Sequence, residues 1–113
     1  MARNDVISKT AHFSLQTPCG ILPSNYQEHL RQLVRASGSV AANWIEADEA
    51  LGKKDFLMRV KICRKEAKES RLFLRLLDAG LAKNTASSRD SLAKEARELT
   101  LIFSAIISKS CGL

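Results

Sequence analysis

Proline is almost absent from this 113-residue chain, and several other absences narrow its class further. The two prolines stand at positions 18 and 23, so nothing from Ser24 onward forbids long helices. No segment approaches the run of about 18 apolar residues that a membrane span needs. The first residues also lack the apolar core of a signal peptide. We therefore expect a cytoplasmic protein that does not contact a membrane.

Residue patterns typical of catalytic, metal-binding or phosphate-binding sites are also scarce. The three cysteines, at positions 19, 63 and 111, are odd in number and lack metal-ligand spacing. His12 and His29 are the only histidines, and neither belongs to a Glu-x-x-His pattern. The five glycines form no phosphate-binding loop. These absences predict no enzyme, no metal site and no cofactor, and we expect Cys63, which falls on an apolar stripe, to be buried.

Helical periodicity is what the chain does have. From residue 24 onward, apolar residues recur in alternating steps of four and three, which is typical of long helices packed at small angles. The pattern predicts helices over 24–51, 53–83 and 89–109. Gly52 is expected to end the first of them in a left-handed conformation, and the polar run 84–88 is expected to form a loop.

The N-terminal segment 1–23 is less regular. Residues 5–16 can form a short helix, and Pro18, Gly20 and Pro23 prevent that helix from continuing. Tight turns between the three long helices require them to run antiparallel. We therefore predict a single all-α domain, residues 1–113: an antiparallel up-and-down four-helix bundle whose first helix is short and irregular. The groove that three rods leave open would be closed by that helix or by a second subunit.

The positive charge of the chain is concentrated in one segment. The net charge is +6, and the segment from Lys53 to Arg75 accounts for all of it, because the other residues carry equal numbers of each sign. Within the segment, cations recur at helical spacing over about 21 Å of helix. This row consists of Lys61, Arg64, Lys68, Arg71 and Arg75.

Three interpretations of this cationic row remain open. It can be an ordinary solvated surface, a ridge that binds phosphates, or a contact between subunits. In the third case it would meet the mixed row on the other side of the same helix, which contains Glu66 and Glu69. The six aromatic residues leave no platform for stacking bases, because five of them lie on or beside apolar seams. The candidate nucleic-acid-binding residues are Lys54, Lys61, Arg64, Lys65, Lys68, Arg71 and Arg75.

A polar cluster lies beside the apolar seam of the first long helix. Arg35, Ser39, Asn43 and Glu46 fall within an arc of roughly 80°. No nucleophile and base accompany them, so we interpret the cluster as structural, fixing the register between helices.

The residues from Leu30 to Leu77 resemble a known family. This is the four-helix-bundle family first described as proteins encoded in intervening sequences of bacterial 23S rRNA genes. The matching motifs are Gln32-Leu33, Arg35, Ser39-Val40, Ala42-Asn43, Glu46-Ala47, Lys53-Lys54-Asp55-Phe56 and Lys65-Glu66-Ala67-Lys68-Glu69-Ser70.

The resemblance implies an up-and-down four-helix bundle that often assembles into a five-fold ring. It also implies kinship with the accessory protein of diversity-generating retroelements, a basic ring that binds nucleic acid and a reverse transcriptase. Together with the row of cations from Lys61 to Arg75, it leads us to expect a non-enzymatic homo-oligomer, with a pentamer as the implied form, that binds RNA or DNA backbone without base specificity through this row. The alternative is a protein–protein scaffold with no nucleic-acid role.

Overall fold

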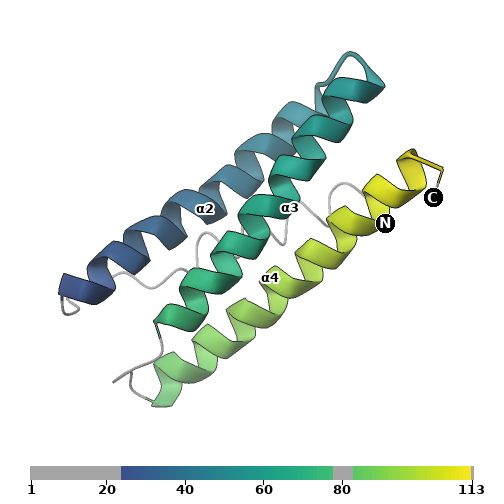
Figure 1. Ribbon diagram of the computed structural model, residues 1–113. Coiled ribbons are helices and arrows are strands. Elements are labelled where there is room, and N and C mark those ends of the chain that lie inside the picture. Colours follow the sequence, from purple (N-terminus) through teal and green to yellow (C-terminus); the bar gives the residue numbers. More distant parts are fainter. Residues whose placement is uncertain (1–23, 78–82, 113) are drawn as a thin grey trace.

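Three long helices make up the described part of the chain. The computed structural model describes residues 24–77 and 83–112, which form α2 (Ser24–Asp48), α3 (Lys53–Leu76) and α4 (Lys83–Ser110). The helices run antiparallel, with α3 between the other two (Figure 1). These residues contain no strand, so the all-α class is confirmed. The predicted first helix falls outside the described residues, and the four-helix form of the bundle stays a prediction.

The turn between α2 and α3 differs from the prediction at Gly52. This glycine does not end α2 in a left-handed conformation; its backbone is extended (φ −144°, ψ 162°) and it stands in the N-cap position of α3. Its carbonyl accepts the hydrogen bond of the Phe56 N–H at 3.0 Å. Leu51, the last residue of the predicted helix 24–51, is fully exposed in the turn, because α2 already ends at Asp48.

The boundary between α3 and α4 also differs from the prediction. α3 ends at Leu76, where the Leu77 N–H bonds to the carbonyls of Phe73 and Leu74, and α4 begins at Lys83 instead of residue 89. The polar run 84–88 therefore lies within a helix, and the predicted loop is wrong. Serine, threonine and asparagine favour loops, but they are equally suited to the first turns of a helix, whose N–H groups lack intrahelical partners.

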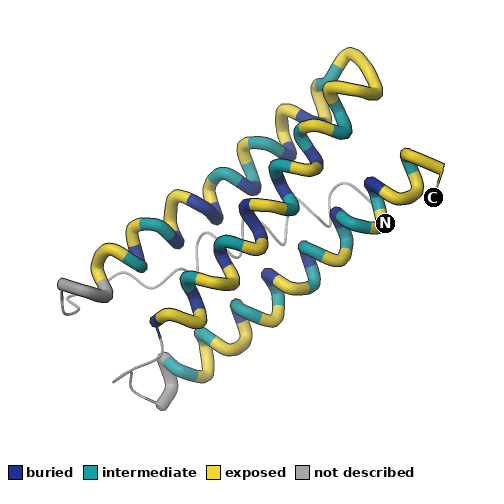
Figure 2. Tube along the Cα trace, viewed as in Figure 1, coloured by how far each residue is buried: buried dark blue, intermediate teal, exposed yellow. Residues whose placement is uncertain are grey.

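The core runs along the inner side of the three helices, on the predicted seams (Figure 2). No Cα atoms of α2 and α4 come within 8 Å of each other, so these two helices meet only through side chains. The rings of Trp44 and Phe103 join them, with centroids 5.9 Å apart. Near this pair one buried cluster draws on all three helices: Val40, Trp44, Ala47, Val60, Cys63, Ala67, Leu99, Phe103 and Ile107.

A second buried cluster continues the core toward the α3–α4 connection. It contains Leu30, Leu33, Leu74, Leu77, Leu92 and Ala96. Two buried serines interrupt the apolar seams, and each hydroxyl donates to a carbonyl of its own helix: Ser37 to Val34 at 3.2 Å and Ser70 to Glu66 at 2.8 Å. Because their polar groups are bonded, both serines can be buried without a large penalty. None of the described helices is long and apolar enough to cross a membrane.

Candidate nucleic-acid interface

The buried seam of α3 separates two flanks with different surroundings. The seam consists of Val60, Cys63, Ala67, Ser70 and Leu74, which are all buried. The residues that directly follow them form the cationic flank, defined as Lys61, Arg64, Lys68, Arg71 and Arg75. One residue before the seam positions lies the α2-facing flank, defined as Arg59, Ile62, Glu66, Glu69 and Phe73. At 100° per residue, the two flanks point away from each other on either side of the core.

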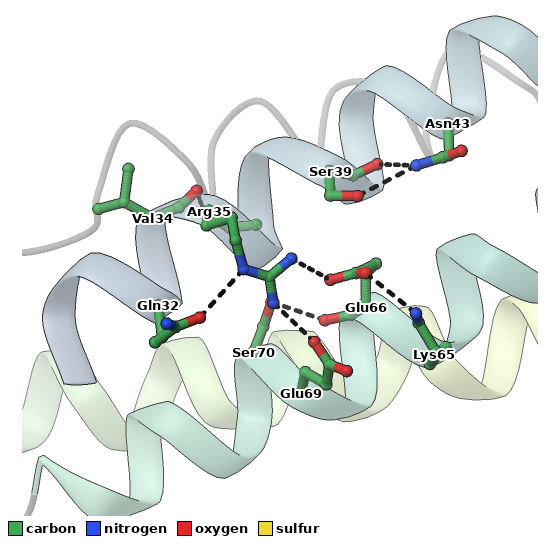
Figure 3. Close-up of polar contacts among 10 residues, drawn as sticks. Gln32, Val34, Arg35, Ser39, Asn43, Lys65, Glu66, Glu69 and Ser70 are labelled. Atoms are coloured by element: carbon green, nitrogen blue, oxygen red, sulfur yellow. Dashed lines mark hydrogen bonds and ion pairs between the residues drawn. The ribbon is translucent and has the colours of Figure 1, made fainter. Parts of the chain in front are cut away.

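The carboxylates of the α2-facing flank are paired within the chain (Figure 3). Arg35 of α2 contacts Glu66 at 3.3 Å and Glu69 at 2.8 Å, and Lys65 contacts Glu66 at 3.5 Å. Gln32 accepts a further hydrogen bond from the Nε of Arg35 at 3.1 Å. The hydrogen bond to Glu69 raises the pKa of Arg35 above its ordinary value. Glu66 is buried, and these cations offset the cost of removing its carboxylate from water.

A second polar contact joins the same two helices nearer their turn. The amide oxygen of Asn43 accepts a hydrogen bond from Arg59 at 3.2 Å. The amide nitrogen of Asn43 donates to the carbonyl of Ser39 at 2.9 Å and to its hydroxyl at 3.1 Å. Arg59 also lies 3.9 Å from Asp55. Arg35 and Asn43 of the predicted polar cluster thus contact α3 directly, and Ser39 supports Asn43. Glu46 is exposed and has no polar contact with the described residues.

The cationic flank lies on the α4 side of α3. Lys61, Lys68, Arg71 and Arg75 are exposed, and Arg64 is half-buried. Within residues 24–77 and 83–112, none of the five forms an ion pair with a carboxylate. The other two candidates differ from them: Lys54 is exposed on the same face of α3 but lies seven residues before Lys61, whereas Lys65 pairs with Glu66.

The neighbouring face of α4 offers the cationic flank little negative charge. Ala93 packs beside the second buried cluster and faces α3, and Thr100 and Ser104 share its side of α4 at helical spacing. Glu98 lies two residues from Thr100, which is about 200° of helix rotation. The carboxylate on the near side is Asp90, which pairs with Arg89 at 2.9 Å. The positive potential of α3 is therefore not cancelled by the helix beside it.

The cationic flank ends at a hollow between α3 and α4 that sequence reasoning missed. It has a volume of about 540 Å³, and its lining comes from the C-terminal end of α3 and the first half of α4. The lining residues are Leu72, Leu74, Arg75, Leu76, Arg89, Asp90 and Ala93. Since these residues come from two helices separated by a connection, no spacing pattern in the sequence would have brought them together.

The aromatic residues and cysteines occupy mostly structural positions. Trp44 and Phe103 are buried, and Phe56 and Phe73 are half-buried, so the described side chains include no exposed aromatic ring. Cys63 is buried, as predicted, and its thiol lies 3.5 Å from the Val40 carbonyl. Burial raises the pKa of this thiol to about 12. Within the described ranges, no group of three or more histidine, cysteine or acidic residues could hold a metal ion.

The fold and this surface together define a class: all-α proteins built from long antiparallel helices, here with one basic flank that no carboxylate among the described residues neutralises. The chain is similar to a crystal structure from Bacteroides thetaiotaomicron, that of a protein of unknown function from the S23 ribosomal protein family. The TM-score is 0.76 at 24% identity, over 96% of this chain and 99% of that one. This likeness shows a shared fold. No family model matches the chain, and no curated protein matches it either.

Proposed function

We propose that this chain is a non-enzymatic, cytoplasmic protein that binds the backbone of RNA or DNA through the cationic flank of α3. The observation that carries the proposal is the row of five cations without a carboxylate partner among the described residues. The shared fold with an S23-family protein supports it, as does the sequence resemblance to proteins of 23S rRNA intervening sequences. Neither catalysis nor a cofactor is part of the proposal.

The energetics of the row favour a binding role over an ordinary surface. Its members form four successive like-charge pairs at i,i+3 or i,i+4 spacing. Each such pair destabilises a helix by about 0.2–0.5 kcal/mol, so the row costs about 1–2 kcal/mol in the isolated protein. A polyanion that neutralises the cations would remove this repulsion and release counterions.

Binding to labelled RNA and duplex DNA between 50 and 200 mM salt tests the proposal. With five phosphate contacts, the affinity should fall with a log–log slope of about −3.5 for single strands and −4.5 for B-DNA. Fluorescence anisotropy measures this directly. Undetectable binding at 50 mM salt, or binding that does not respond to salt, would rule the proposal out.

A matched pair of variants distinguishes binding at the cationic flank from a general attraction by the net charge of the protein. Lys61→Glu/Lys68→Glu reverses two exposed lysines of the row, and Lys94→Glu/Lys109→Glu reverses two exposed lysines of α4. Both variants change the net charge equally. We expect the first to weaken binding at least tenfold more than the second, because only the first removes direct phosphate contacts. Equal losses would mean that net charge alone attracts the nucleic acid.

We propose further that the protein is a homo-oligomer, with a pentameric ring as the form implied by the resemblance. The supporting surface is the edge of α2 turned away from α3, where Val34 and Ile45 are exposed on either side of Gly38. A glycine inside a helix costs about 1 kcal/mol relative to alanine. No atom of the described residues would contact a Cβ at Gly38, so packing among them does not require glycine there. Sedimentation should show assembly for the wild type and a smaller species for Ile45→Asp.

The alternative is a protein–protein scaffold in which the cationic flank meets Glu66 and Glu69 of the next subunit. Both carboxylates contact Arg35 within the same chain, and this pairing favours the backbone-binding proposal. Under the scaffold alternative, reversing Lys61, Arg64 and Lys68 to glutamate dissolves the oligomer. A triple variant that keeps its assembly but loses nucleic-acid binding excludes the scaffold.

A further inference from the structure

The hollow at the end of the cationic flank is large enough for a small ligand. Its volume of about 540 Å³ lies within the roughly 300–1,000 Å³ that is usual for small-molecule sites. Leucine side chains of α3 and Ala93 of α4 provide apolar walls, while Arg75, Arg89 and Asp90 provide charge. An apolar wall combined with guanidinium groups suits a ligand that has both a flat apolar body and an anionic group.

The two arginines of the hollow differ in their exposure and in their ion pairing. The Arg89 side chain is only 15% exposed and is held by Asp90 at 2.9 Å, so it is a fixed part of the wall. Arg75 is exposed and forms no ion pair with the described residues. A guanidinium in this state can bind a phosphate through two parallel hydrogen bonds. Asp90 keeps an exposed carboxylate, which can accept a hydrogen bond from an exocyclic amino group of a base.

Arg75 connects the hollow to the proposed phosphate-binding surface. It is the last member of the cationic flank and also part of the lining of the hollow. Arg71 precedes it by one helical turn, which is about 6 Å of helix. A strand whose phosphates follow the flank would therefore bring a phosphate to Arg75 and the attached sugar and base to the apolar walls beside it.

We infer that the hollow receives one unpaired nucleotide of a strand bound along the cationic flank. This inference rests on the proposed function and gives it a substrate class: single-stranded nucleic acid, or a strand with an unpaired nucleotide. A duplex keeps its bases stacked and paired, so its backbone can contact the cations but its bases cannot enter the hollow without the cost of unpairing. The cations alone would not distinguish the two forms.

The test compares a 12-nucleotide RNA strand with a duplex of the same length at one salt concentration. We expect the wild type to prefer the single strand by about fivefold, which corresponds to burying about 40 Å² of apolar base surface at about 25 cal/mol per Å². Ala93→Leu narrows the hollow and should remove this preference while leaving duplex affinity and the salt slope unchanged. Ala105→Leu, at an exposed position of α4 away from the hollow, is the matched control and should behave as the wild type.

A second pair of variants keeps the test valid if leucine at position 93 disturbs the core. Leu72→Asn removes an exposed part of the apolar wall, and Met58→Asn makes a similar change on α3 away from the hollow. Only Leu72→Asn should reduce the single-strand preference. If both variants of the hollow keep the wild-type preference, the nucleotide does not enter the hollow and the inference is wrong.

The remaining outcomes separate this inference from the proposed function. Equal affinity of the wild type for strand and duplex, with a steep salt slope, overturns the inference and leaves the proposed function standing. If neither the single strand nor the duplex binds detectably at low salt, both the inference and the proposed function are wrong. Cytidine monophosphate and inorganic phosphate, titrated separately, distinguish a strand from a free nucleotide. A monophosphate that binds as tightly as the 12-nucleotide strand would replace this inference with a free-nucleotide site.

Discussion

On the α2 side of α3, Arg59, Glu66 and Glu69 each contact a partner, whereas the five cations on the α4 side have no carboxylate partner among the described residues. Both flanks border the same buried seam, and both contain charged residues at helical spacing. The difference lies in the neighbouring helix: α2 presents Arg35 and Asn43, whereas the facing side of α4 presents mainly alanine and hydroxyl residues, and its Asp90 pairs with Arg89. Charges on the first flank hold two helices together, and charges on the second remain available to a partner.

The largest expected effect on stability comes from breaking the paired flank at Arg35. Arg35→Ala should lower the free energy of unfolding by about 2–3 kcal/mol, because among the described residues buried Glu66 would keep only Lys65 as an ion-pair partner. Urea unfolding measures the change. The control Arg71→Ala removes an unpaired, exposed arginine and should change stability by no more than about 0.5 kcal/mol.

Adding Glu66→Gln to the Arg35→Ala variant sharpens this test. Replacing the Glu66 carboxylate, which has lost its arginine partner, by a neutral amide should recover part of the lost stability. If Arg35→Ala and Arg71→Ala prove equally harmless, the contrast between the two flanks is wrong.

A smaller loss is expected at the other polar contact between α2 and α3. Asn43→Ala should cost about 1 kcal/mol, because it removes the acceptor of the Arg59 hydrogen bond. Glu46→Ala, from the same predicted polar cluster, should have no measurable effect, since Glu46 has no polar contact with the described residues. Thermal unfolding of the two variants side by side would expose an error if Glu46→Ala were the more damaging.

On the unpaired flank, a charge reversal should stabilise the isolated protein. Lys68→Glu replaces repulsion from Arg64 and Arg71 by attraction, for a gain of about 0.5–1 kcal/mol. The control Lys94→Glu should show no gain, because Asp90 and Glu98 flank that position at i−4 and i+4. Lys68→Glu should at the same time weaken nucleic-acid binding. A loss of stability in this variant would indicate that Lys68 has a structural partner.

At neutral pH the smallest electrostatic effect is expected from Cys63. The pKa of this thiol is near its ordinary value of 9.0 in the unfolded chain and about 12 in the folded protein. Its contribution to stability is therefore complete below pH 9 and is lost progressively as the pH rises toward 12. The stability of the wild type should fall relative to Cys63→Ala over this range and run parallel to it at neutral pH. Urea unfolding across this pH series measures the difference.

Much of the helical architecture could be predicted from local patterns. The seam residues Leu33, Val40, Trp44 and Phe103 are buried where alternating steps of four and three place them, because those steps return to one side of a helix. The helix ends were less predictable. Gly52 and the polar run 84–88 carry signals that suit both a turn and a helix N-terminus, and local sequence does not decide between them.

The candidate site was only half predictable for a similar reason. Spacing alone placed Lys61, Arg64, Lys68, Arg71 and Arg75 in one row, and the described helix confirms that row as a continuous flank. Spacing could not show that Lys65 pairs with Glu66, nor that Arg35 contacts residues 31 and 34 positions away. It also could not show the hollow beside Arg75, which depends on the position of α4.

The order of amino acids determines the three helices, their buried seams and the row of cations, because residues at regular spacing lie on the same face of a helix. The pairing of individual charges and the hollow in the surface came instead from the assembly of the three helices. Those properties depend on how each helix is rotated and aligned against its neighbour, and that alignment is set by the packing of side chains such as Trp44 and Phe103 across the whole core.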